Sequence, residues 1–397
     1  MDFNNPNGSY YNLTFGFIII YFMKKLILLF FILLLLCACS NEYKKLGYSV
    51  KAANVISSLD EKDQVFFSEY DENLDSIFSN KDFKLDNLRL YIQFSRHLNG
   101  DDIVRLVNDG TIGYYNYGVI KNLTSNKDFV VEKINEYLDL YKDIKDVDTV
   151  IFMAKQGIDS DVELVSKLIK DKGYIVDNLP LYLKYKDDKE EIRSLVEYVN
   201  TLSFLRYYED NFYAEPDKYG TEVLVNKYYY LGPDYVPTDL IELKEYGYGS
   251  LRKVAYDAYV KMYEAAKKDG VSFYVTSSYR SYKTQVIIYN RYLTIDPQEK
   301  VDIYSARPGF SDHQTGYTVD ILTSGHDFDT FYLTPAAKWL ADNAYKYGFI
   351  LRYPEGLEQA TGYEYEAWHF RYVGDVASDV YKSGLSYDEY FAKYIEE

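Results

Sequence analysis

The sequence predicts an α+β protein in which an all-helical region of repeats precedes a mixed C-terminal domain. Three observations lead to this fold class. A short motif recurs about every 45 residues in the first half of the chain, and strand-like and helix-like runs interleave without a βαβ rhythm in the second half. The length of 397 residues is enough for two or three domains.

The N-terminus predicts an export signal over residues 1–39. Lys24 and Lys25 follow Met23, the expected true start, and thirteen largely apolar residues then lead to Cys39. The end of this run resembles a bacterial lipobox, in which Cys39 would be lipidated and become the new N-terminus. We therefore expect an extracytoplasmic protein held at the cell membrane by a lipid anchor. A transmembrane anchor is the alternative, because several residues before Met23 are also apolar.

The first half of the chain carries three similar segments, at residues 82–92, 128–138 and 173–183. Their leading aromatic residues are 46 and 45 positions apart, and a Tyr follows eight residues after each of them. This period predicts stacked helical hairpins over residues 40–205, with no catalytic cluster and a partner that the sequence does not identify. Residues 206–221 lack periodicity and are interpreted as a linker.

The C-terminal domain, residues 222–397, shows mixed patterns. Residues 316–322 alternate so that Asp320 lies on the face opposite Val319 and Ile321. Helical spacing predicts two helices, and alternation or β-branched runs predict the strands. The predicted helices are 253–268 and 336–347, and the predicted strands are 223–227, 271–275, 316–322 and 368–373.

Composition excludes several classes of function. The net charge of −17 argues against a nucleic-acid partner, and two Cys cannot build a disulfide scaffold or a Cys-rich zinc module. A metal site could draw on only four His. His313 stands seven residues before Asp320, and Glu366 stands three residues before His369. Two imidazoles and one carboxylate are a common ligand set for catalytic zinc, and an additional Glu can accept a proton from water.

One geometric condition follows from this spacing. Side chains three apart on a regular strand point to opposite faces of the sheet. The sequence therefore requires a turn or a bulge between Glu366 and His369, or a strand that starts after Glu366.

The C-terminal domain resembles the VanY-type D-alanyl-D-alanine carboxypeptidases, which are zinc peptidases that share a fold with the hedgehog signalling domain. The matching blocks are residues 277–285, 307–321 and 347–374, and the resemblance extends over residues 222–397 but not over the repeats. It implies that His313, Asp320 and His369 bind Zn²⁺ and that Glu366 is the catalytic base. It further implies that Arg280 is catalytic and lies beside the substrate, where it holds the terminal carboxylate or polarises the attacked carbonyl. Ser311 and Gln285 fall where related enzymes contact substrate.

The function implied by this resemblance is removal of the terminal D-Ala from peptidoglycan stem peptides. An L,D-carboxypeptidase acting on tetrapeptide stems is one alternative, because both enzymes read a free D-Ala carboxylate. A non-catalytic lipoprotein that binds the wall or a partner is an alternative of another class. The presence of both Glu366 and Arg280 favours an enzyme over a non-catalytic lipoprotein.

Overall fold

The computed structural model describes residues 43–59, 64 and 74–396, so the expected signal peptide and Cys39 lie outside the described residues. The chain divides into two compact units, residues 1–158 and 159–397. Among the described residues, every helix is too short or too polar to cross a membrane.

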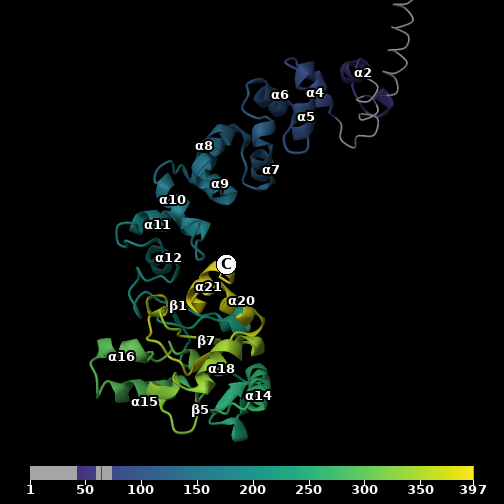
Figure 1. Ribbon diagram of the computed structural model, residues 1–397. Coiled ribbons are helices and arrows are strands. Elements are labelled where there is room, and N and C mark those ends of the chain that lie inside the picture. Colours follow the sequence, from purple (N-terminus) through teal and green to yellow (C-terminus); the bar gives the residue numbers. More distant parts are fainter. Residues whose placement is uncertain (1–42, 60–63, 65–73, 397) are drawn as a thin grey trace, which may run out of the picture. The chain divides into compact units, whose positions relative to one another are not determined.

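Each repeat contains three short helices rather than the expected two, because an additional helix precedes each hairpin and packs on it. The first two repeats belong to the first unit and the third to the second unit, and Figure 1 shows the short helices following one another along the chain. The helices are α2 (Val50–Ser57); α4 (Asp75–Ser79), α5 (Leu88–Phe94) and α6 (Gly100–Asn108); α7 (Tyr117–Ser125), α8 (Ile134–Ile144) and α9 (Val147–Gln156); and α10 (Val162–Leu168), α11 (Leu179–Tyr185) and α12 (Ile192–Asn200).

The same tyrosine contact recurs in all three repeats. The hydroxyls of Tyr91, Tyr137 and Tyr182 accept hydrogen bonds of 3.2–3.3 Å from the backbone N–H seven residues earlier. Each of these rings also contacts the leading aromatic ring of its segment, with centroids 5.6–5.8 Å apart. The same individual contacts therefore recur at the spacing of the three predicted segments.

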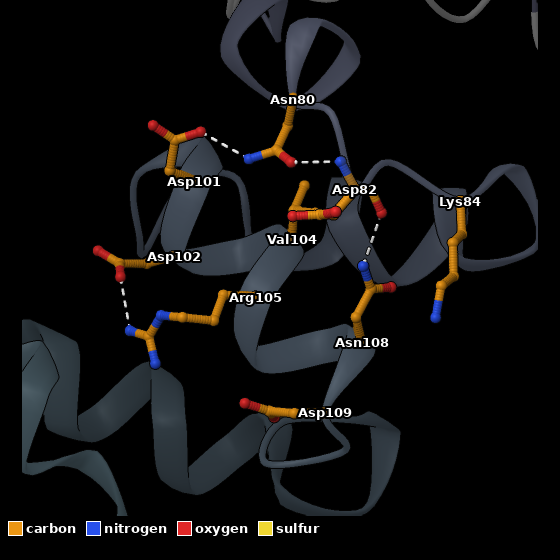
Figure 2. Close-up of a pocket in the computed structure, with 9 residues that line it drawn as sticks. All are labelled: Asn80, Asp82, Lys84, Asp101, Asp102, Val104, Arg105, Asn108 and Asp109. Carbon is orange, nitrogen blue, oxygen red and sulfur yellow. Dashed lines mark hydrogen bonds and ion pairs between the residues drawn. The ribbon is translucent and has the colours of Figure 1, made fainter.

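A polar clamp joins the turn before each repeated helix to the last helix of the repeat. In the first repeat, Asn80 Nδ2 donates to Asp101 Oδ1 at 2.7 Å while Asn80 Oδ1 accepts from the N–H of Asp82 at 2.8 Å (Figure 2). Asn108 Nδ2 also donates to the carbonyl of Asp82 at 2.8 Å. The side chains that make these bonds line an open hollow of the first repeat, so Asn80, Asp101 and Asn108 act there as structural groups.

The rest of the second unit is a mixed domain. Its helices are α13 (Pro216–Tyr219), α14 (Lys253–Lys268), α15 (Tyr282–Tyr292), α16 (Gln298–Tyr304), α17 (Phe328–Phe331), α18 (Pro335–Asn343), α19 (Glu358–Thr361), α20 (Ala377–Ser383) and α21 (Tyr387–Tyr394). Its strands are β1 (Phe212–Tyr213), β2 (Tyr229–Tyr230), β3 (Leu240–Glu242), β4 (Ser250–Arg252), β5 (Tyr274–Ser277), β6 (Thr318–Leu322), β7 (Phe349–Leu351) and β8 (His369–Tyr372).

The central sheet is antiparallel with strand order β5-β6-β8-β7. Val319 and Ile321 of β6 join the main hydrophobic core with residues of α14 and α18. The alternation of β6 therefore turns Asp320 away from Val319 and Ile321, as predicted. The α+β class and the helical region before this domain are confirmed.

The predicted strand over residues 223–227 is wrong. Val223, Leu224 and Val225 are buried in two separate apolar clusters without pairing in a sheet. The side chain of Asn226 then closes a turn, because its Oδ1 accepts from the N–H groups of Tyr228 and Tyr229. Apolar composition alone does not distinguish such a buried segment from a strand.

The segment expected to be a linker packs within the second unit. β1 pairs in parallel with β2, and the ring of Tyr208 contacts Phe310 with centroids 5.0 Å apart. The third repeat is part of the same unit through contacts of α12 with α19 and α21. The expected boundaries at residues 205 and 222 stay predictions, but no free spacer separates these described segments.

Candidate active site

Two neighbouring strands bring the central residues of the site together. Asp320 of β6 and His369 of β8 are direct cross-strand partners, and Asp320 Oδ1 lies 3.3 Å from His369 Nδ1. His313 lies in the 3₁₀ turn Asp312–Thr315 that leads into β6, and its Nε2 lies 3.2 Å from Asp320 Oδ2. Gly316 ends this turn at φ +76°, where a Cβ would lie 2.9 Å from the side chain of Arg252.

The second nitrogen of His313 fixes which atom faces the site. Nδ1 lies 2.7 Å from the carbonyl oxygen of Ser278. A carbonyl only accepts hydrogen bonds, so Nδ1 carries the proton and Nε2 presents a lone pair. Nε2 of His313 and Oδ1 of Asp320 are both buried and make no hydrogen bond within the described residues. These two buried atoms are therefore available to bind a ligand.

The spacing of these atoms fits a metal ion. A tetrahedral zinc ion with bonds of about 2.0–2.2 Å separates neighbouring ligand atoms by about 3.3–3.6 Å. The two imidazole–carboxylate distances around Asp320, 3.2 and 3.3 Å, are close to that value. Asp312, His313 and His369 form a second compact grouping, with ligand atoms within 4.8 Å of one another. Asp312, however, lies against Nε2 of His369, the ring nitrogen that does not face Asp320.

Glu366 satisfies the geometric condition raised by the sequence. It precedes β8, and a turn closed by the bond from the N–H of His369 to the carbonyl of Glu366 (3.2 Å) separates the two residues. This turn brings Glu366 Oε2 to 2.9 Å from His369 Nδ1. Burial, opposed in part by His369, raises the pKa of the Glu366 carboxyl, as suits a group that accepts and returns a proton near neutral pH.

The site concentrates buried negative charge. Asp312, Asp320 and Glu366 surround one imidazole, that of His369. Burial alone would raise the pKa of Asp320, but His313 and His369 outweigh it and hold that pKa well below its usual range. Burial likewise opposes protonation of His369, but Asp312 foremost raises its pKa well above the usual value. Three buried carboxylates around two imidazoles are a setting that a divalent cation would balance.

These residues line a pocket of about 240 Å³. Arg280 and Ser311 also line it, and Nε of Arg280 is buried without a hydrogen-bond partner among the described residues. Gln285 does not line the pocket. It is buried on α15, where its Nε2 donates at 2.7 Å to the carbonyl of Ala306 in the pocket wall.

The wall also includes aromatic side chains. Phe328 and Trp368 contact each other with ring centroids 4.9 Å apart, and Tyr353 contacts His369 at 4.7 Å. Only the proximity of Asp312 to His313 in the sequence could have indicated the role of Asp312. The other lining residues are Tyr292, Tyr304, Ser305, Ala306, Asp329, Tyr363 and Glu364.

A buried lysine lies behind this wall. The Lys227 ammonium lies 4.7 Å from the Tyr207 ring centroid and 4.5 Å from that of Tyr363, and it donates to the carbonyl of Gly362. Its side chain comes from the segment that was expected to be a strand. Burial lowers the pKa of Lys227 to about 8. Lys227 therefore supports the pocket wall at Tyr363 without entering the pocket.

Comparison with known proteins agrees with this geometry. Residues 249–375 match the family model of VanY, D-alanyl-D-alanine carboxypeptidase. The chain is 42% identical over 181 residues to YodJ of Bacillus subtilis (strain 168), covering 43% of this chain and 66% of that protein. It is 33% identical over 190 residues to a D-alanyl-D-alanine carboxypeptidase of Enterococcus faecium, covering 45% and 59%. The chain thus spans less than two thirds of the length of these relatives.

Two solved structures are similar in sequence to this chain. The LdcB LD-carboxypeptidase is 41% identical, with 44% of this chain and 87% of that chain covered and a TM-score of 0.41. The vancomycin-resistance D,D-pentapeptidase VanY, solved as a mutant with Zn(II), is 30% identical, with 43% and 98% covered and a TM-score of 0.39. The residues matched by the family model include the strands and turns that carry the site. Through residues 249–375, this chain belongs to the VanY family of D-alanyl-D-alanine carboxypeptidases.

Proposed function

We propose that the C-terminal domain is a zinc-dependent D-alanyl-D-alanine carboxypeptidase that trims the C-terminal D-Ala of peptidoglycan stem peptides. The observation that carries this proposal is the convergence of His313 Nε2, Asp320 and His369 Nδ1 in one pocket with Glu366 and Arg280. The three convergent groups would hold Zn²⁺.

Zinc would supply Lewis-acid chemistry, polarising the scissile carbonyl and lowering the pKa of a bound water to about 7. Glu366, buried and 2.9 Å from His369, would take the proton from the attacking water and deliver it to the leaving amine. The carboxylate needs no large movement for this role, because its turn holds it directly beside His369.

Arg280 would bind the terminal carboxylate of the peptide. Its guanidinium lines the same pocket and has a buried, unpaired Nε, so a planar carboxylate could accept hydrogen bonds from it. Such a contact selects peptides with a free C-terminus over internal bonds. Ser311 and the aromatic wall of Phe328 and Trp368 would hold the short peptide end.

The test is digestion of purified muropeptides by the full chain, followed by mass spectrometry. Loss of one D-Ala from pentapeptide stems supports the proposal, whereas release only from tetrapeptides would identify an L,D-carboxypeptidase. Glu366→Ala should retain zinc and lose turnover, and Glu299→Ala, an exposed acid on α16, is the matched control. Zinc binding without hydrolysis of any muropeptide would instead indicate a binding lipoprotein.

We further propose that Cys39 carries the lipid that anchors the protein outside the cell. The charged start, the apolar run and the lipobox-like end support this. Labelling with a fatty-acid analogue should mark the wild type and not Cys39→Ala, and the variant should leave the membrane fraction. An unlabelled wild type that stays membrane-bound would favour a transmembrane anchor. In the anchored protein, the helical repeats would hold the C-terminal domain near the cell wall.

A further inference from the structure

The third repeat differs from the first two in its polar clamp. Asn80 donates to Asp101 in the first repeat (Figure 2). Asn126 donates to Asp148 at 2.8 Å in the second. The equivalent pair in the third repeat has the opposite polarity, because Arg193 Nη1 donates to Asp171 Oδ1 at 2.9 Å. The clamp itself is kept, since the Asp171 carboxylate still accepts from a backbone N–H two residues later, at 2.8 Å. The helix residue of the clamp is thus an arginine on α12, where the first two repeats have an aspartate.

Arg193 also reaches the catalytic domain with one of its remaining donors. Its Nε lies 3.0 Å from Glu197 on the same helix, and its Nη2 pairs with Glu389 of α21. Glu389 is fully buried and also closes the capping box of α21, because its Oε2 accepts from the N–H (3.2 Å) and the hydroxyl (3.0 Å) of Ser386. Arg193 therefore holds the first turn of α21 against the third repeat.

The residue next to Glu389, Asp388, binds a second arginine on the side of the metal site. Asp388 accepts from Arg352 Nη1 at 2.5 Å and from Asn226 Nδ2 at 2.7 Å. Consecutive residues of a helix point about 100° apart, so Glu389 and Asp388 can be bound from two different sides. Asp388 and Arg352 are both almost fully buried, at 3% and 1% exposure, and each depends on the other for charge balance.

Arg352 connects Asp388, through Asp312, to His369, a candidate metal ligand. Its Nε lies 3.8 Å from Asp312 Oδ2, and Asp312 Oδ1 lies 3.2 Å from His369 Nε2. The Arg352 guanidinium also lies over the ring of Tyr353, which packs on His369. Carboxylates on the outer nitrogen of a ligand imidazole orient the ring toward the metal.

We propose that Arg193, Asp388 and Arg352 are positioning residues that couple the docked third repeat to His369. The third repeat is then a structural part of the catalytic unit rather than a spacer. The inference rests on the proposed metal site at His313, Asp320 and His369. It goes beyond that proposal by assigning a role to residues that do not touch metal or substrate.

The test measures metal binding in the full chain, with Zn²⁺ affinity from chelator competition and the ligand-field absorption of Co²⁺ as readouts. Arg352→Met and Asp388→Asn should each weaken Zn²⁺ binding about 10–100-fold and alter the Co²⁺ spectrum. Arg193→Met should weaken it less, by about 3–10-fold, because it acts through Glu389 and the helix. Arg193→Lys should recover part of this loss, because it keeps one charge for the carboxylates.

Matched controls are Arg206→Met and Asp379→Asn, which alter exposed ion pairs of the same unit and should leave both readouts unchanged. Arg193 is partly exposed, so Arg193→Met gives a second result if a buried variant fails to fold by circular dichroism. Wild-type affinity and spectra in folded Arg193→Met would overturn the coupling to the third repeat. The same result in Asp388→Asn would overturn the whole inference. A wild type that binds no Zn²⁺ would overturn the proposed metal site, and this inference with it.

Discussion

Oδ1 of Asp312 lies 3.2 Å from Nε2 of His369, on the side of the ring opposite Asp320. Asp312 is almost fully buried and lies beside Arg352. Its carboxylate therefore orients the imidazole, whereas Asp320 shares the space that the ion would fill. The two acids differ in role although both contact the same histidine.

This difference predicts unequal effects on metal binding. Asp312→Asn should weaken Zn²⁺ binding about 10–100-fold, because the outer contact of His369 is reduced while the ligand atoms remain. Asp320→Asn should weaken it by more than about 100-fold, because a ligand is removed. Chelator competition measures both. Equal losses in the two variants would mean that Asp312 is itself a ligand.

Arg280 should set the preference for a free C-terminus. Arg280→Ala is expected to lower kcat/KM for a pentapeptide acid about 10²–10³-fold, because it removes a charged partner of the substrate carboxylate. The ratio of activities on the acid and on its C-terminal amide should fall toward one. Arg291→Ala, an exposed arginine of α15, is the control. If Arg280→Ala kept the wild-type ratio, another group would read the carboxylate.

Local pattern was enough to predict some elements and insufficient for others. The predicted helix over 253–268 coincides with α14, and alternation placed Asp320 opposite the core-facing residues of β6. The apolar run at 223–227 was wrongly predicted to be a strand, because a segment buried in separate clusters has the same sequence pattern as one buried in a sheet. Motif spacing and the family resemblance together placed His313 and His369 in one predicted metal site. It could not reveal that Arg193 would meet Glu389, since that contact depends on how two elements 196 residues apart pack.

We expect equivalent tyrosines of the repeats to contribute unequally to stability. The Tyr91 hydroxyl accepts from the N–H of Lys84 and donates to Asn108 at 2.7 Å, whereas the Tyr137 hydroxyl has only the bond from Val130 among the described residues. Tyr91→Phe should therefore destabilise the first unit by about 1–2 kcal/mol and Tyr137→Phe by about 0.5–1 kcal/mol. Hydrogen exchange of amides in the full chain measures both opening free energies. Equal losses would show that the bond to Asn108 contributes nothing.

The lowered pKa of Lys227 predicts that the folded protein becomes more stable above pH 8. Its pKa is about 8 in the folded protein, against 10.5 for the unfolded chain, because burial disfavours the charged ammonium. Below pH 8 both states keep the proton, and between pH 8 and 10.5 only the unfolded state does. The free energy of unfolding therefore rises with pH across this window, by at most about 3 kcal/mol from this group.

Lys227→Met removes this titration and isolates it from the tyrosines and from the nearby Asp302 and Arg307, which both chains share. The stability of the wild type relative to Lys227→Met should increase from pH 8 to pH 10. Urea unfolding of the C-terminal unit at pH 7, 8, 9 and 10 measures the difference. Parallel pH profiles for the two proteins would show that Lys227 keeps its ordinary pKa, and that the wall behind Tyr363 carries no desolvated charge.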